Sequence, residues 1–477
     1  PEVSLLAASA AVASLPLTLI ELRGIQGLMP SFAMTIFDFG IDARAVGMTV
    51  ALAVVSTFVF GLIPALKLMR VESSPALQSQ GVRTTGGKAA ARLRTVLTTA
   101  QIALSMALLV LAGWFAQSLY NVAREDLGFR AETLTVFSLA PDRNGYTVER
   151  TSQLFERLED ELAQVPGVTS VALASVPLIA NAMWQFGVTV EGYDAAPGEN
   201  PNVAFNYVSP GFFHTVEMPL VSGSVFERVQ GGDGPANVAV VNERFVERFG
   251  LDPDNALGKR ITTGTNGPVD AQIVGIVRDA KYSQVNRAAP PQMFLSRACG
   301  PVVYLRSDSA ALALRSSVEQ VLARHDANLP LLGFRTMAAQ AEENVFLERF
   351  MSTLATALAV MATVLAAIGI YGVLSYGVAQ RLREIGLRVA LGAAPGNVRR
   401  MVLKQVAWMA GVGVAIGVSL SLLLGQAVRG LLYGLSPTDP LVPATAVLAL
   451  TLVVLAAAYW PARRAAHVDP VTALRGD

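Results

Sequence analysis

Long uninterrupted apolar runs dominate the hydrophobic pattern of this 477-residue chain. A membrane-spanning helix needs about 20 apolar residues. Six runs approach or exceed that length without any Asp, Glu, Lys, Arg or His, at residues 3–20, 46–66, 96–119, 350–379, 406–428 and 441–459. The pattern therefore predicts six membrane-spanning helices. The fourth would be about 45 Å long against a hydrocarbon core of about 30 Å, so we expect it to tilt or to project from the membrane.

Between the third and fourth runs the pattern changes to short strand-like segments and amphipathic helices. Apolar, β-branched segments predict strands at residues 134–139, 168–174, 238–241, 273–277 and 302–305. Helical spacing of apolar residues predicts helices around residues 154–165 and 318–322. Residues 121–346 are thus predicted to be an α+β domain large enough for its own core. The acidic run on the first helix is expected to be a solvated face; it comprises Glu156, Glu159, Asp160 and Glu161.

Charge is partitioned along the chain. Segments 67–95 and 380–404 each hold six Lys or Arg residues and one acid, Glu72 and Glu384 respectively. In residues 121–346, 26 acidic residues outnumber 18 basic ones. Because basic loops stay in the cytoplasm, the pattern predicts that both basic segments and the tail after Pro461 lie inside, and that residues 121–346 lie outside.

Composition narrows the function classes. Only 15% of the residues are charged, against about a quarter in a soluble protein, and a net charge of +1 argues against a nucleic-acid binder with a broad basic face. The single cysteine, Cys299, excludes a disulfide within the chain. The three histidines are widely separated, so neither a metal site nor a cofactor is expected. The chain starts at Pro1 without a signal-peptide pattern, and we interpret it as the later part of a longer protein.

An internal repeat relates the beginning of the chain to its end. Six residues recur without a gap at an offset of 397 positions. They are Asp42, Pro64, Ala65, Val71, Ala76 and Leu77, repeated as Asp439, Pro461, Ala462, Val468, Ala473 and Leu474. The match favours a duplicated module. The alternative is that any membrane span exits into similar basic sequence.

The basic loop after the fourth span carries the most distinctive motif. Residues 384–393 read Glu-Ile-Gly-Leu-Arg-Val-Ala-Leu-Gly-Ala and are followed by Pro395 and Gly396. The spacing predicts a short cytoplasmic helix with apolar residues available for docking. Such a helix could fit the groove of a partner protein or could lie in the membrane interface, held by lipid headgroups. The spacing alone leaves both open.

This motif resembles the signature of FtsX/MacB-type ABC transporter permeases. The tail, residues 461–474, is similar to the end of the same permease domain. Residues 241–245, 257–261 and 273–279 (Val-Asn-Glu-Arg-Phe, Leu-Gly-Lys-Arg-Ile and Ile-Val-Gly-Ile-Val-Arg-Asp) resemble the MacB-like periplasmic core domain in that family's order. The duplicated arrangement resembles that of orphan permeases carrying two modules. The resemblance covers essentially the whole chain.

The resemblance implies a membrane protein in which a six-span helical bundle carries an α+β extracytoplasmic MacB-like periplasmic core domain. It assigns 1–69 to the last two helices of an upstream FtsX-like module, 70–95 to a cytoplasmic linker, 96–120 to a transmembrane helix, 121–346 to the periplasmic core, 347–460 to an FtsX-like permease domain with coupling loop 380–404, and 461–477 to a cytoplasmic tail. It also implies a coupling helix that binds a separate ATPase. The matching residues are Glu384, Ile385, Gly386, Arg388, Ala390, Gly392 and Ala393.

The implied function is that of a permease subunit in the bacterial inner membrane. It would transmit ATP-driven motion to the periplasmic domain for export or extraction of a peptide, lipid-linked or drug-like substrate. The implied partners are a cytoplasmic ABC ATPase, membrane lipids, a periplasmic or outer-membrane protein, and either a homodimer mate or a pseudo-dimer within a longer chain. The alternative is an FtsX-like regulator that controls a periplasmic hydrolase without moving a solute. A third hypothesis is a receptor whose outer domain binds a ligand and whose membrane spans have only a structural role. It predicts no ATPase partner.

Other chemistry finds little support in the sequence. A P-loop needs Lys and then Ser or Thr directly after its second glycine, but in residues 81–89 the lysine is one place late and Ala89 follows it. The spans offer only neutral polar groups, which argues against ion coupling. Gly413 and Gly417 are expected to allow close helix packing. Aromatic residues near span ends are expected to be interface anchors; these are Trp114, Tyr120, Tyr371 and Trp460.

Overall fold

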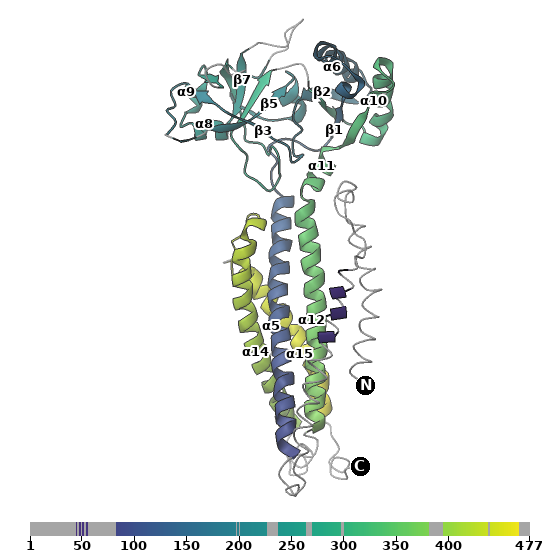
Figure 1. The fold of residues 1–477 in the computed structure, drawn as a ribbon, viewed down its shortest axis with the longest axis vertical. Coiled ribbons are helices and arrows are strands. Elements are labelled where there is room, and N and C mark those ends of the chain that lie inside the picture. The colour runs from purple at the N-terminus through teal and green to yellow at the C-terminus, as the bar shows by residue number, and fades with distance from the viewer. Residues whose placement is uncertain are drawn as a thin grey trace. The chain divides into compact units, whose positions relative to one another are not determined.

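The computed structural model describes most of the chain from Arg83 onward and a few earlier positions (Figure 1). The described residues are 44, 47, 48, 50, 51, 54, 55, 83–196, 198–199, 201–226, 237–263, 270–296, 300–380, 395–436 and 439–466. The chain divides into two compact units. We call Pro1–Leu119 with Glu348–Asp477 the helical unit, and Tyr120–Leu347 the sheet unit.

In the part of the chain that the structure describes, four long apolar helices build the helical unit. They are α5 (Arg83–Ala123), α12 (Phe346–Gln380), α14 (Pro395–Val428, extended by the 3-10 turn η4, Arg429–Leu431) and α15 (Leu441–Ala466). Each is long and apolar enough to cross a membrane, which confirms the third to sixth predicted runs as helices. Run 3–20 lies outside the described residues, and run 46–66 is described at only six positions. The count of six spans therefore stays a prediction.

One stripe of α5 forms the centre of the helix packing. Ile102, Met106, Val110 and Trp114 recur every four residues and are fully buried, because that spacing places them on one helix face. The expectation that Trp114 anchors the membrane interface is wrong, since the indole lies on this inward stripe. Tyr120, Tyr371 and Trp460, by contrast, are exposed.

The close packing predicted at Gly413 and Gly417 of α14 is confirmed. A Cβ added at Gly413 would lie 2.7 Å from Cγ2 of Ile102, and one at Gly417 would lie 2.5 Å from the carbonyl oxygen of Ala103. Both glycines therefore let α14 approach α5 more closely than any side chain would permit.

A twelve-stranded mixed sheet forms the sheet unit, with strand order β12-β1-β11-β2-β5-β10-β7-β9-β8-β4, while β3 pairs with β5 and β6 with β9. The strands are β1 (Leu134–Leu139), β2 (Val168–Ala174), β3 (Trp184–Gly187), β4 (Thr189–Val190), β5 (Asn202–Val208), β6 (Leu220–Gly223), β7 (Val238–Asn242), β8 (Arg260–Thr262), β9 (Asp270–Val277), β10 (Gln292–Ser296), β11 (Val302–Ser307) and β12 (Leu331–Thr336). The helices are η3 (Pro141–Asn144), α6 (Val148–Ala163), α7 (Phe212–Val216), α8 (Glu243–Arg248), α9 (Pro253–Ala256), α10 (Ala311–His325) and α11 (Met337–Asn344). All five predicted strands and both predicted helices are present, and the unit is α+β as expected.

The sheet has two halves, each with its own apolar core. Helices α6 and α10 pack together on the half formed by β12, β1, β11 and β2 (Figure 1). Helices α8 and α9 pack on the half that contains β7, β9 and β10. The halves meet where β2 pairs with β5 through a single registered pair, Ala174 and Val208.

The acidic run on α6 is not wholly solvated, which corrects the prediction for Glu159. This residue is 7% exposed, and its Oε1 accepts a hydrogen bond from Oγ of Ser209 at 2.8 Å. The same hydroxyl oxygen accepts the N–H of Leu173 on β2 at 3.0 Å. Glu159 thus secures the junction between the two halves, because a buried carboxylate needs a donor of this kind.

Candidate functional site

The predicted coupling residues lie outside the described residues. Glu384, Ile385, Gly386, Arg388, Ala390, Gly392 and Ala393 all fall within residues 381–394, and their role stays a prediction. The structure does describe the two helix ends that flank them. Helix α12 ends at Gln380, and α14 begins at Pro395, where proline is tolerated because the first helical N–H has no intrahelical acceptor.

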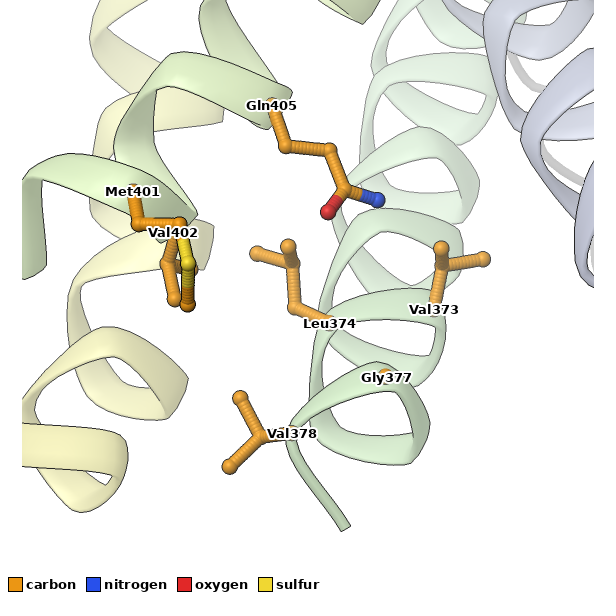
Figure 2. A pocket seen from close by; sticks show the side chains of 7 residues that line it. All are labelled: Val373, Leu374, Gly377, Val378, Met401, Val402 and Gln405. Carbon is orange, nitrogen blue, oxygen red and sulfur yellow. The ribbon is translucent and has the colours of Figure 1, made fainter. Parts of the chain in front are cut away.

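A shallow hollow lies between these two helix ends. Figure 2 shows its lining from α12 and α14, which consists of Val373, Leu374, Gly377, Val378, Met401, Val402 and Gln405. A Cβ on Gly377 would meet nothing within 4 Å, so this position leaves space at the hollow. With Gln405 as its one polar lining side chain, the hollow can hold an apolar group but cannot supply the charged ligands of a metal site. Elsewhere among the described residues, no three His, Cys, Asp or Glu side chains form a group that could hold a metal ion.

Arg94 on α5 contacts Tyr376 near the end of α12. Its guanidinium carbon lies 3.9 Å from the ring centroid of Tyr376, a cation–π contact. The hydroxyl oxygen of Tyr376 accepts a hydrogen bond from Nε2 of Gln380 at 2.8 Å. One cation–π contact thus joins α5 to the end of α12, and Gln380 is bonded to the same tyrosine within α12.

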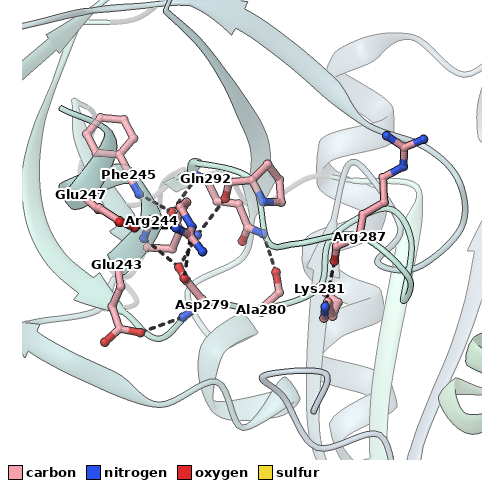
Figure 3. Close-up of polar contacts among 11 residues, drawn as sticks. Glu243, Arg244, Phe245, Glu247, Asp279, Ala280, Lys281, Arg287 and Gln292 are labelled. Carbon is pink, nitrogen blue, oxygen red and sulfur yellow. Dashed lines mark hydrogen bonds and ion pairs between the residues drawn. The ribbon is translucent and has the colours of Figure 1, made fainter. Parts of the chain in front are cut away.

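In the sheet unit, the three stretches that resemble the periplasmic core domain meet around β9. Asn242 caps α8 by accepting the N–H of Phe245 at 3.0 Å, and its Nδ2 donates to Oδ1 of Asp279 at 2.7 Å. The N–H of Arg244 donates to the same oxygen at 2.8 Å (Figure 3). The N–H of Gly258, in the second stretch, donates to the carbonyl of Ile273, in the third, at 2.8 Å. Side-chain hydrogen bonds thus join the first stretch to the third, and a backbone hydrogen bond joins the second stretch to the third.

Burial raises the pKa of Asp279 above its ordinary value of 3.8. The N–H of Arg244 and its guanidinium work in the opposite direction, while the carboxylates of Glu243 and Glu247 add to the rise. The Asp279 side chain is held by Asn242 and by the N-terminus of α8. We therefore assign these residues to the architecture of the unit.

Sequence reasoning missed a buried lysine in the same region. Lys281 is 7% exposed and pairs with Glu125 at 3.0 Å. From the sequence alone, a lysine that follows a strand motif is expected to be an ordinary surface residue. Its partner lies more than a hundred positions earlier in the chain, so no local spacing could have revealed the pair.

Comparison with known protein families assigns both units. The MacB-like periplasmic core domain family matches residues 95–342. The FtsX-like permease C-terminal family matches residues 356–470.

The curated relatives that this chain matches are named as export proteins. The chain is 25% identical over 406 residues to the macrolide export ATP-binding/permease protein MacB of Acinetobacter baylyi, covering 80% of this chain and 57% of that protein. It is also 25% identical over 332 residues to the pyoverdine export ATP-binding/permease protein PvdT of Pseudomonas fluorescens, covering 65% of this chain and 49% of the relative. The chain thus spans about half the length of these relatives.

Among solved structures, the periplasmic region of MacB from Actinobacillus actinomycetemcomitans aligns with 46% of this chain and 96% of its own, at 12% identity and a TM-score of 0.31. The extracellular domain of the noncanonic ABC-type transporter YknZ from Gram-positive bacteria aligns with 42% of this chain and 99% of its own, at 12% identity and a TM-score of 0.28. The family matches, which together span most of residues 95–470, are the stronger finding. The chain belongs to the MacB/FtsX-type ABC transporter permease family, with a MacB-like periplasmic core domain and an FtsX-like permease domain.

Proposed function

We propose that this protein is the permease subunit of an ABC transporter, in which it transmits the ATP-driven motion of a separate ATPase to the periplasmic domain. The observation that carries the proposal is the presence of both family domains in one chain, at residues 95–342 and 356–470. The chain passes from the helical unit to the sheet unit within α5 and returns within α12. Each connection is thus a continuous helix, which suits the transmission of force better than a flexible loop would.

The substrate in this proposal is a peptide, a lipid-linked molecule or a drug-like compound, exported from the periplasm or extracted from the membrane. The names of the relatives, which refer to macrolide and pyoverdine export, support an export role. The protein would reside in the bacterial inner membrane with residues 121–346 in the periplasm, because the basic segments 67–95 and 380–404 favour the cytoplasmic side.

In this proposal a separate subunit hydrolyses ATP; the 477 residues themselves contain no P-loop sequence. We place the ATPase contact on the seven predicted coupling residues, Glu384 to Ala393. These residues lie in the segment between α12 and α14, and a helix there would connect directly to both long helices. Membrane lipids surround the helical unit, and the transporter assembles either as a homodimer or as a pseudo-dimer within a longer chain.

Co-purification with the ATPase tests the proposal. The full chain, tagged at its C-terminus, is isolated from native membranes as wild type and as Glu384→Lys and Gly392→Trp. Two matched variants serve as controls. Glu319→Lys makes the same charge reversal on the exposed face of α10, and Gly430→Trp adds an indole where a Cβ would meet nothing within 4 Å.

We expect an ABC ATPase to bind the wild type and both controls and to be lost from both coupling variants. Recovery of no ATPase, or equal recovery from all five proteins, would overturn the proposal and favour a receptor. Reconstitution of the purified pair in liposomes then separates transport from regulation. ATP-dependent substrate movement supports the permease, whereas activation of a bound periplasmic hydrolase without substrate movement identifies an FtsX-like regulator.

A further inference from the structure

Residues 278–287, which follow β9, contact two stretches of the chain: the stretch that enters the sheet unit and the stretch that leaves it. We call residues 278–287 the clamp segment. The entering chain consists of residues 124–128, directly after α5. The leaving chain consists of α11, which ends at Asn344 two residues before α12 begins. All of these residues belong to the sheet unit.

The entering chain is held by Lys281. Its ammonium group lies 3.0 Å from Oε1 of Glu125 and donates to the carbonyl of Arg287 at 2.8 Å; Figure 3 shows this second contact. The N–H of Lys281 also donates to the carbonyl of Leu127 at 2.9 Å. Because the lysine is 7% exposed, its charge depends on these acceptors more than on water.

The backbone of the entering chain also lies close against the clamp segment. Gly128 has a φ of +76°, and a Cβ there would lie 2.1 Å from the carbonyl oxygen of Asp279. Only glycine permits both the left-handed conformation and this approach.

The leaving chain is held by Asn344. Its Oδ1 accepts the N–H of Val285 at 2.9 Å, and its Nδ2 donates to the carbonyl oxygens of Ser283 at 3.1 Å and Ile179 at 3.3 Å. One amide side chain thus attaches the end of α11 to the clamp segment and to the turn after β2.

The clamp segment is itself anchored in the sheet. The carbonyl of Ala280 accepts Nε2 of the buried Gln292 on β10 at 2.7 Å (Figure 3). The hydroxyl of Tyr282 donates to the carbonyl of Phe205 on β5 at 2.8 Å. Ala280 and Tyr282 are each 1% exposed, so the segment between the two chain ends is part of the core.

We propose that Lys281 is a positioning residue that locks the entering and leaving chains into one block with the sheet. Motion that arrives along α5 or α12 would then move the sheet unit as a rigid body and would not be absorbed at its base. This inference rests on the proposed function. A purely local role for Lys281 predicts that only the entering chain loosens when the ion pair is removed.

Hydrogen exchange distinguishes the two cases, because two amides report the two sides. The amide of residue 281 is bonded to Leu127, and the amide of Val285 is bonded to Asn344. The full-length chain in lipid nanodiscs is compared as wild type, Lys281→Met, which keeps the apolar stem, and Arg278→Met. Arg278 is the matched control, since it pairs with Asp126 at 3.1 Å but both side chains are more than half exposed, and exposed pairs contribute little.

In Lys281→Met we expect exchange to accelerate about tenfold at both amides, which corresponds to about 1.4 kcal/mol of local stability. The Gly258 amide, bonded to Ile273 elsewhere in the unit, should be unchanged, and Arg278→Met should match the wild type at all three sites. Glu125→Gln combined with Lys281→Met should be no worse than either single change, because the two side chains act as a pair. Acceleration at residue 281 alone, or an equal effect of Arg278→Met, overturns the proposal.

A second measurement connects the clamp to transport. In liposomes with the ATPase, Lys281→Met should still bind the ATPase but should move less substrate per ATP hydrolysed than Arg278→Met does. Equal yields of substrate per ATP in the two variants overturn the positioning role. If the wild type binds no ATPase, the proposed function fails, while the exchange result still decides whether the clamp exists.

Discussion

Replacing Asn242 with alanine removes four hydrogen bonds from the interior of the sheet unit. The side chain is fully buried. Its Oδ1 accepts the N–H groups of Phe245 at 3.0 Å and Gln292 at 2.8 Å. Its Nδ2 donates to Oδ1 of Asp279 at 2.7 Å and to the carbonyl of Pro290 at 2.9 Å. Because an amide has two donors and two acceptor sites, every hydrogen-bonding capacity of Asn242 is used.

The cost of the substitution follows from what each partner loses. The N–H of Phe245 loses its helix cap, worth about 1 kcal/mol. The N–H of Gln292 is left unpaired in a buried strand, which costs about 2 kcal/mol. The carbonyl of Pro290 and the Asp279 oxygen together lose about 1 kcal/mol, since Asp279 keeps its bond from the N–H of Arg244. The sheet unit should therefore lose about 4 kcal/mol of unfolding free energy.

Urea unfolding of the full-length chain in nanodiscs measures this loss. Trp184 is the one tryptophan of the sheet unit, so its fluorescence reports that unit once the other three tryptophans are replaced by phenylalanine. With a denaturant slope of about 2.5 kcal/mol per molar, the midpoint should fall by about 1.6 M. The control Asn255→Ala, at an exposed position of α9, should shift it little. A midpoint shift for Asn242→Ala no larger than that of the control would refute the account of this network.

Two further predictions use the same reasoning. Burial raises the pKa of Asp279 above 3.8, so its contribution to stability is present at low pH and is lost as pH rises through the raised pKa; Asp279→Asn should flatten that part of the curve of urea midpoint against pH, and an unchanged curve contradicts the assignment. Gly417→Val places a side chain where a Cβ would lie 2.5 Å from the Ala103 carbonyl oxygen, and overpacking of about 1–3 kcal/mol should lower the thermal midpoint of the helical unit. Gly411→Val, where nothing lies within 4 Å, is its control, and an equal shift in both variants would rule out the close approach of α14 to α5.

Features that depend on local pattern were predictable from the sequence. Each of the four described membrane-type helices contains its predicted apolar run, and the five predicted strands lie within a few residues of their expected positions, because apolar runs and alternation reflect local periodicity. The close packing at Gly413 and Gly417 was also predictable, since only the lack of a side chain matters there. The coupling residues 384–393 were recognised by motif alone and remain a prediction.

Features that depend on which face a residue presents could not be read from the sequence. Trp114 stands near the end of an apolar run like an interface anchor, yet its position four residues after Val110 places it on the buried stripe of α5. Glu159 stands in a run of acids, yet it accepts a hydrogen bond from Ser209, which directly follows β5 and is distant in sequence. In both cases the neighbour that decides the environment comes from another element.

The apolar spans, the two kinds of domain and the family of this protein could all be inferred without a structure, because composition, periodicity and motif order are properties of the chain. The fold was needed to find that Asn242 and Asp279 share hydrogen bonds and that Lys281 joins Glu125 and, through residues 278–287, Asn344. A buried polar group must find its partner wherever the fold places one. Such pairings join residues far apart in sequence, and no local pattern records them.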